Sequence, residues 1–215
     1  MIVTNIVFYV SSHVNIQNKC VKCPTEDDDG IFYLRRLPGN AEEKCGRQAL
    51  PSVQGLLVPV VDSPSAFDEF ARKCFYPPHG TRGTALGRFN RWGDDFETYR
   101  ATFQPVLVPM IETRRGVEAA AEIASLDHVD ALFFGPYDLS ADLGDGGNFS
   151  ASEFIAARAQ ILEAAQKSGK ACGGHQVEPA PENLSAMIED GFRFIAYGTD
   201  VVALRASMAT FKTTI

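Results

Sequence analysis

The chain has 215 residues, of which 45% are hydrophobic, so it is long enough to bury one sizeable core in a single domain. A net charge of −7 leaves no basic patch to follow a phosphate backbone, which argues against nucleic acid as a partner. No segment approaches the length of a membrane span, and the odd count of five cysteines fits a cytoplasmic protein better than a disulfide framework.

Short apolar runs alternate with helical patterns from about residue 54 onward, which predicts βα units and a parallel sheet. Near-continuous apolar runs predict strands at residues 5–10, 32–37, 55–61, 106–111, 129–134, 170–173 and 192–196. Helical spacing of apolar residues predicts helices at 65–74, 115–125, 152–168, 181–190 and 201–211. The strands are one short of the eight in a closed (β/α)8 barrel, so either one strand is missing or a neighbouring subunit covers the gap.

The N-terminal third of the chain is less regular. Residues 18–30 mix lysines, cysteines and an acidic run without periodicity, which indicates a loop. A short helix at residues 41–50 is expected to lead into the regular part.

Two carboxylates follow neighbouring predicted strands. Glu112 stands directly after the strand at 106–111, and Asp138 lies just beyond the strand at 129–134. Because parallel strands present their carboxyl ends at one edge, which is the catalytic face of a βα barrel, these side chains are expected to converge. Their hard oxygen atoms suit Mg²⁺ or Mn²⁺. Two simpler interpretations stay open: Glu112 as an acid that stabilises the start of the next helix, and Asp138 as a helix N-cap.

A series of motifs lies between residues 34 and 204. It includes Arg-Leu-Pro-Gly-Asn at 36–40, Tyr-Pro-Pro-His-Gly-Thr-Arg-Gly at 76–83, Ile-Glu-Thr at 111–113 and Gly-Pro-Tyr-Asp-Leu-Ser at 135–140. This series resembles the HpcH/HpaI family of class II, metal-dependent aldolases, which is related to the β subunit of citrate lyase. The resemblance implies a (β/α)8 TIM barrel that lacks its first strand–helix unit. Residues 1–30 would be a divergent segment with a partial barrel strand, and residues 31–215 the aldolase-like barrel, as part of a homo-oligomer.

The resemblance also assigns roles to residues at matching positions. Glu112 and Asp138 resemble the metal ligands, and Arg36 resembles the arginine that contacts the keto oxygen and stabilises the enolate. The backbone of Tyr137, with Asp138, matches the position that binds the substrate carboxylate. The implied reaction is the retro-aldol cleavage of a 4-hydroxy-2-keto acid into pyruvate and an aldehyde. The implied cofactor is Mg²⁺ or Mn²⁺, with Co²⁺ or Zn²⁺ as alternatives.

The chain departs from the family pattern at its acid–base group. His13 weakly matches the family histidine that handles a proton through water, but the aspartate that orients this histidine is absent where the chain has Pro51. An imidazole without a fixed tautomer is a weaker base, so lower turnover is expected. Two alternatives therefore stay open: a catalytically impaired metal-binding paralogue, and a citrate-lyase-β-like lyase acting on a CoA thioester. The other histidines, His79, His128 and His175, have no partner at ligand spacing and are expected to be solvated.

Overall fold

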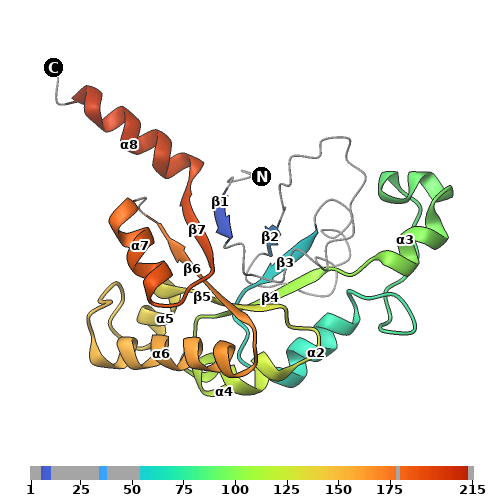
Figure 1. Ribbon diagram of the computed structural model, residues 1–215, viewed down its shortest axis with the longest axis horizontal. Coiled ribbons are helices and arrows are strands. Elements are labelled where there is room, and N and C mark those ends of the chain that lie inside the picture. The colour runs from blue at the N-terminus through green and yellow to red at the C-terminus, as the bar shows by residue number, and fades with distance from the viewer. Residues whose placement is uncertain (1–5, 11–33, 38–53, 178–179, 213–215) are drawn as a thin grey trace.

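The computed structural model describes residues 6–10, 34–37, 54–177 and 180–212. Its strands are β1 (Ile6–Val10), β2 (Leu34–Arg36), β3 (Gly55–Val58), β4 (Val106–Ile111), β5 (Ala131–Phe134), β6 (Ala171–Gln176) and β7 (Phe194–Thr199). These described strands form one sheet in the order β1-β7-β6-β5-β4-β3-β2 (Figure 1). The expected helix at 41–50 and the expected loop at 18–30 lie outside the described residues.

Strands β2 to β7 are parallel, as the alternation of apolar runs and helical patterns predicts. β1 is the exception, because it pairs antiparallel with β7. The parallel sheet predicted from residue 54 onward is present, but β1 departs from the all-parallel strands of a (β/α)8 barrel. Neighbouring parallel strands in a βαβ unit owe their direction to the crossover between them, whereas β1 and β7 are far apart in sequence and no such unit fixes their relative direction.

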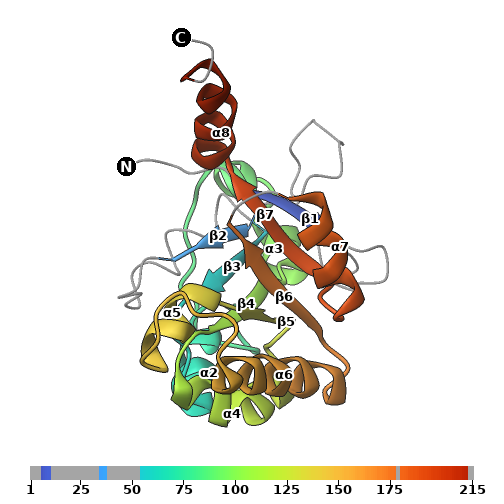
Figure 2. The same cartoon turned by 90° about the vertical axis from the view of Figure 1, so that its left-hand side faces the viewer.

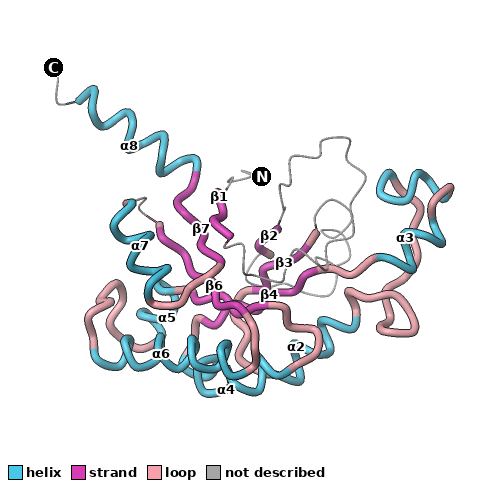
Figure 3. The backbone as a smooth tube through the Cα atoms, in the orientation of Figure 1, coloured by secondary structure: helices cyan, strands magenta, loops and turns pink. Residues whose placement is uncertain are grey.

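Helices cover one face of the sheet. The described helices are α2 (Pro64–Arg72), α3 (Phe96–Thr102), α4 (Arg114–Ser125), α5 (Pro136–Asp142), α6 (Ser152–Lys167), α7 (Pro181–Glu189) and α8 (Asp200–Lys212), with the 3-10 segment η3 (Arg88–Gly93). α4 packs between α2 and α6 along one side of the strands, and α8 extends away from the sheet (Figures 1 and 2). Figure 3 shows α3 and η3 at the opposite end of the molecule from α7. None of the described helices combines the length and the hydropathy of a membrane-spanning helix.

The two faces of the sheet carry separate apolar clusters, because successive side chains of a strand point to opposite faces. The face toward the helices is formed by residues such as Leu107, Ile111 and Phe134. The other face, here called the inner face, consists of Leu57, Val106, Val108, Met110, Ala131, Phe133, Phe194 and Ala196. Residues two positions further along a strand from an inner-face residue share that face, which places Glu112 beyond Met110 on the inner side.

The ends of several strands differ from those predicted from the sequence. β3 ends at Val58 rather than near residue 61, whereas β6 and β7 each run three residues beyond their expected ends. The short helix α5 begins at Pro136 and has Gly135 at its N-cap position, so Asp138 lies within the first turn and the N-cap interpretation of Asp138 is wrong. Segments α3 and η3 had no counterpart among the expected elements.

Candidate active site

Glu112 is a buried carboxylate at the carboxyl end of β4. Its side chain is only 2% exposed, and its Oε1 accepts a hydrogen bond of 2.7 Å from the backbone N–H of Val60. Its Oε2 is also buried, and no described residue donates a hydrogen bond to it. Since a buried charged oxygen without a partner is costly, this atom needs either a proton or a cation.

Val60 holds its N–H toward Glu112 through an unusual backbone conformation. Its φ angle is +53°, in the left-handed region that a β-branched residue rarely adopts. Such a conformation costs on the order of 1–3 kcal/mol and persists where surrounding contacts fix it. The neighbouring N–H of Val61 donates to the carbonyl of Met110 at 3.1 Å, which ties this loop to β4. The loop after β3 therefore supplies a fixed donor to the Glu112 carboxylate.

Gly135 makes room for the same carboxylate from the other side. A Cβ atom at Gly135 would lie 2.7 Å from Oε2 and 2.9 Å from Cβ of Glu112. The N–H of Gly135 donates to the carbonyl of Ile111 at 3.3 Å, so the ladder between β4 and β5 continues to the level of Glu112. No residue with a side chain fits here unless Glu112 moves.

Asp138 brings a second carboxylate to Glu112. It is exposed and lies in the first turn of α5, where the helix dipole favours an acid. Burial raises the pKa of Glu112, and the contact with Asp138 raises it further, whereas the Val60 N–H and the charge of Arg36 lower it. Like charges in contact are stabilised by a shared proton or a shared cation. The pair therefore fits a divalent ion that prefers oxygen ligands.

Two side chains make an incomplete coordination shell. Within the described part of the chain, no group of three or more His, Cys, Asp or Glu side chains is arranged to hold a metal. An ion bound by Glu112 and Asp138 would need its remaining ligands from water or from a small oxygen-rich molecule. This arrangement is the open kind of coordination that suits a catalytic rather than a structural ion.

Arg36 lies on the edge strand β2, and its charge acts on groups of the inner face. It ends β2, is exposed, and lies two residues beyond Leu34, which packs against the inner-face cluster. Its charge lowers the pKa of both Glu112 on β4 and His175 on β6. One guanidinium can act on groups from β4 and β6 because the sheet curls, so that the inner side of the strand ends is concave.

His175 was expected to be solvated, and the structure shows that this expectation is wrong. It lies on β6, is only partly exposed, and its Nε2 is buried without a hydrogen-bond partner among the described residues. Burial lowers its pKa, and Arg36 lowers it further, so its imidazole is neutral at neutral pH. The expectation overlooked the curl of the sheet, which removes this strand end from water. His128 also differs from expectation, because its ring packs 4.9 Å from that of Phe75.

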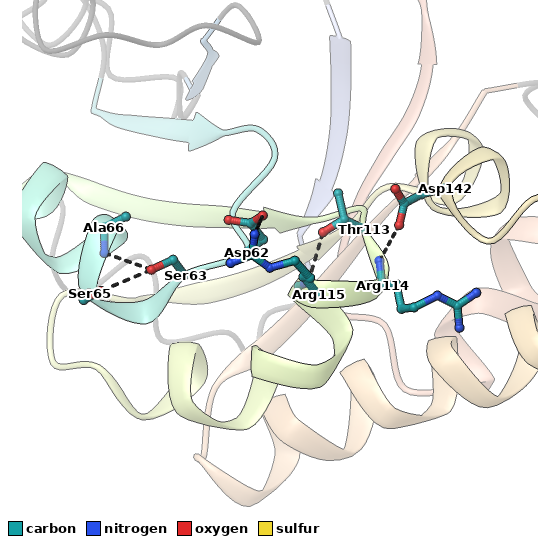
Figure 4. A network of polar contacts seen from close by, with 9 residues as sticks. Asp62, Ser63, Ser65, Ala66, Thr113, Arg114, Arg115 and Asp142 are labelled. Carbon is teal, nitrogen blue, oxygen red and sulfur yellow. Dashed lines mark hydrogen bonds and ion pairs between the residues drawn. The ribbon is translucent and has the colours of Figure 1, made fainter.

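The loops that carry the carboxylates are tied to one another. Thr113 caps α4 by accepting the N–H of Gly116 at 3.0 Å, and the N–H of Arg114 donates to Asp142 of α5 at 2.7 Å. Arg115 pairs with Asp62 at 3.6 Å, which links the start of α4 to the loop after β3 (Figure 4). The three loops that present Val60, Glu112 and Asp138 are thus cross-linked by polar contacts.

The remaining expected site residues are placed less directly. The Tyr137 ring is 51% exposed and packs edge-on against Phe149 at 5.0 Å, while its N–H belongs to the first turn of α5, which has no acceptor within the helix. His13 and Pro51 lie outside the described residues. Sequence reasoning missed the backbone N–H of Val60, for which no sequence signal exists.

A separate cavity of about 430 Å³ lies away from the carboxylates. It is lined by residues that precede β4 and β5, among them Gln104, Pro105, Asp127 and Asp130. It therefore opens at the amino ends of the strands. In parallel α/β folds this end supports stability, and the carboxyl ends carry the chemistry.

Known proteins resemble this chain over most of its length. The family described as HpcH/HpaI aldolase/citrate lyase matches residues 36–207. A hydroxypyruvate/pyruvate aldolase from Delftia acidovorans is 40% identical over 156 residues, covering 71% of this chain and 57% of that protein. A 4-hydroxy-2-oxo-heptane-1,7-dioate aldolase from Escherichia coli is 38% identical over 156 residues, covering 70% of this chain and 58% of that protein.

Solved structures share the fold. The crystal structure of an HpcH/HpaI aldolase/citrate lyase family protein from Burkholderia cenocepacia superposes with a TM-score of 0.77 at 28% identity, covering 84% of this chain and 72% of that one. This match supports a parallel α/β fold with a curled sheet. The chain spans less than two thirds of the length of the two curated relatives.

Proposed function

This chain belongs to the HpcH/HpaI aldolase/citrate lyase family, and on that premise we propose that it is a carbon–carbon lyase that cleaves a 4-hydroxy-2-keto acid into pyruvate and an aldehyde. The observation that carries the proposal is the buried Glu112 carboxylate, which has one oxygen without a hydrogen-bond partner among the described residues and whose pKa is raised by burial and by the charge of Asp138. The curled sheet would be part of a (β/α)8 barrel, with this pair at its mouth.

Glu112 and Asp138 would hold a divalent ion, Mg²⁺ or Mn²⁺, with Co²⁺ or Zn²⁺ as alternatives. When bound, such an ion supplies a positive charge beside the keto oxygen of the substrate. The residues fit a divalent ion because of the chemistry of the donors. Two neighbouring carboxylates, one of them buried, repel each other when both are ionised, and a hard cation between them removes this repulsion.

The protein would contribute three further functions to the cleavage. Arg36 would direct its guanidinium at the keto oxygen, where negative charge develops as the carbon–carbon bond breaks. The N–H of Tyr137 would bind the substrate carboxylate at the start of α5. His13 would accept the proton of the 4-hydroxyl through water. The pyruvate half of the substrate would thus lie over β4 and β5.

The charge around the site favours a keto acid over a CoA thioester. A CoA substrate calls for unpaired basic residues that bind its phosphates. Within the described part of the chain, the basic cluster at the start of α4 is already paired with acids, since Arg114 pairs with Glu153 and Arg115 with Asp62. This pairing supports the smaller substrate.

A homo-oligomer is proposed from the shape of the chain. α8 extends away from the sheet and exposes Val201, Leu204 and Met208 (Figure 1). An isolated helix with exposed apolar residues of this size is expected to pack against another surface. Sedimentation velocity of the purified chain tests this, and a monomer at micromolar concentration would contradict it.

The reaction is tested by pyruvate release, followed with lactate dehydrogenase and NADH. The purified chain is mixed with 4-hydroxy-2-keto acids in the presence of Mg²⁺ or Mn²⁺, and again with excess chelator. We expect release that depends on the metal and is lost in Glu112→Gln. Glu122→Gln on the exposed surface of α4 is the matched control and should keep full activity. Metal binding without release of pyruvate would support the impaired paralogue instead.

A further inference from the structure

Among the described residues on the inner side of the sheet, the imidazole of His175 is a polar group that the proposed reaction does not use. The register of the parallel strands places it. Met110 pairs with Phe133, and Phe133 with Gly173, so the positions two residues later are Glu112, Gly135 and His175. His175 therefore lies at the level of Glu112, and two strand spacings, about 10 Å at the backbone, separate them.

His175 also has the orientation of the inner face. The residue paired with it on β7 is Ala196, which belongs to the inner-face cluster. Two positions earlier on β6, a side chain at Gly173 would collide with Phe133 and Phe194. These two rings pack edge to face at 5.7 Å. His175 thus lies next to the apolar residues of the inner-face cluster, and Gly135 lies between it and Glu112.

The immediate surroundings leave the imidazole unsatisfied. Nε2 is buried, and among the described residues nothing donates to it or accepts from it. The inner-face cluster next to it offers only apolar side chains. Arg36 is close enough to influence it electrostatically, but a guanidinium can only donate, and its charge favours the neutral imidazole. A neutral imidazole nitrogen can donate to or accept from a hydroxyl group, according to its tautomer.

We propose that His175 is a substrate-binding residue whose Nε2 hydrogen-bonds a further hydroxyl group, beyond the 4-hydroxyl, on the aldehyde half of the keto acid. This inference rests on the proposed function, which places the pyruvate half over β4 and β5. The sheet order puts β3 on one side of the β4–β5 pair and β6 on the other. On the β3 side, the Val60 N–H binds Glu112 and Arg36 ends the neighbouring strand β2. The carbons that leave as aldehyde are therefore placed toward β6 and His175. The enzyme would consequently prefer substrates that release a hydroxylated aldehyde over those that release an alkyl aldehyde.

Two substrates that differ by one hydroxyl test the preference. Cleavage of 4,5-dihydroxy-2-oxopentanoate releases glycolaldehyde, and cleavage of 4-hydroxy-2-oxopentanoate releases acetaldehyde, with pyruvate as the common product. We expect His175→Leu to lower kcat/KM about 10- to 100-fold for the first substrate, as for a buried hydrogen bond to substrate, and less than about 3-fold for the second. His175→Gln, which keeps a polar group at the end of the side chain, should retain part of the preference.

His79→Leu is the matched control, because His79 is exposed and lines the cavity at the other end of the sheet. It should leave the ratio of the two kcat/KM values unchanged. Thermal unfolding of each variant establishes that it is folded, and His175→Gln carries the test if His175→Leu is not. If the parent chain cleaves both substrates and neither His175 variant changes their ratio, the inference about His175 is wrong while the proposed function stands. If it cleaves neither substrate, both fall.

Discussion

Replacing Gly135 by alanine tests whether the Glu112 carboxylate must occupy its observed position. The new Cβ would lie 2.7 Å from Oε2 and 2.9 Å from Cβ of Glu112, and contacts below 3.0 Å do not persist in folded proteins. The backbone at Gly135 has φ −102° and ψ 92°, which alanine adopts without strain. The collision therefore acts on Glu112 rather than on the backbone, and it displaces the carboxylate from the position in which it accepts the Val60 N–H.

The expected magnitude follows from what is displaced. Overpacking of this kind costs about 1–3 kcal/mol of stability, partly offset by about 0.4–1 kcal/mol because alanine restricts the unfolded chain. Metal affinity should also fall, by about 10- to 100-fold, as when a group that orients a ligand is removed. Calorimetric titration with Mn²⁺ measures the affinity, and thermal unfolding measures the stability.

A matched glycine provides the control. A Cβ at Gly83 would meet no atom within 4 Å, so Gly83→Ala should leave Mn²⁺ affinity unchanged. If Gly135→Ala binds Mn²⁺ as tightly as the parent chain, the inference that Gly135 exists to accommodate Glu112 is refuted.

Three further predictions concern the same strand ends. The pKa of the Glu112 carboxyl is raised in the folded chain, so the metal-free folded protein binds the carboxyl proton more tightly than the unfolded chain does. Protonation of Glu112 therefore stabilises the fold at low pH, and this contribution is lost as pH rises above about 4.5, the ordinary pKa of the group. Metal-free Glu112→Gln should therefore gain melting temperature relative to the parent as pH goes from 5 to 7.5, and a constant difference would contradict this. Thr113→Ala removes the N-cap of α4 and should lower the free energy of unfolding by about 1 kcal/mol in urea titrations, whereas a change below about 0.3 kcal/mol would show the cap to be unimportant. Val60→Gly keeps the backbone N–H that binds Glu112 and relieves the strain of the positive φ at this position. The free energy of unfolding should therefore rise by up to about 1 kcal/mol, with the Mn²⁺ affinity retained. A loss of Mn²⁺ affinity would mean that the Val60 side chain itself fixes the loop.

The strands that form the middle of the sheet could be predicted because burial on both faces leaves a simple pattern. β4 is buried at every position, and the expected strand at 106–111 has the same bounds. The position of Glu112 directly after that strand was therefore predictable, as was the proximity of Asp138 after β5. Both follow from the rule that parallel strands end at one edge.

Features that depend on three-dimensional closure could not be predicted. Nothing about valine favours the left-handed conformation of Val60, which is imposed by the loop and by the Glu112 carboxylate. The burial of His175 Nε2 depends on the curl that brings Arg36 toward β6, and a local pattern contains no information on that curl. The antiparallel pairing of β1 with β7 joins strands far apart in sequence, and a local pattern does not specify their relative direction.

The most direct test of the central claim is a double-mutant cycle on Mn²⁺ binding. Glu112→Gln and Asp138→Asn are titrated singly and together by calorimetry, with Glu122→Gln as the surface control. If the two carboxylates hold one ion, the parent chain binds one Mn²⁺ per chain, each single variant loses most of the affinity, and the double variant loses little more. If either single variant binds Mn²⁺ like the parent chain, the two carboxylates do not form one metal site.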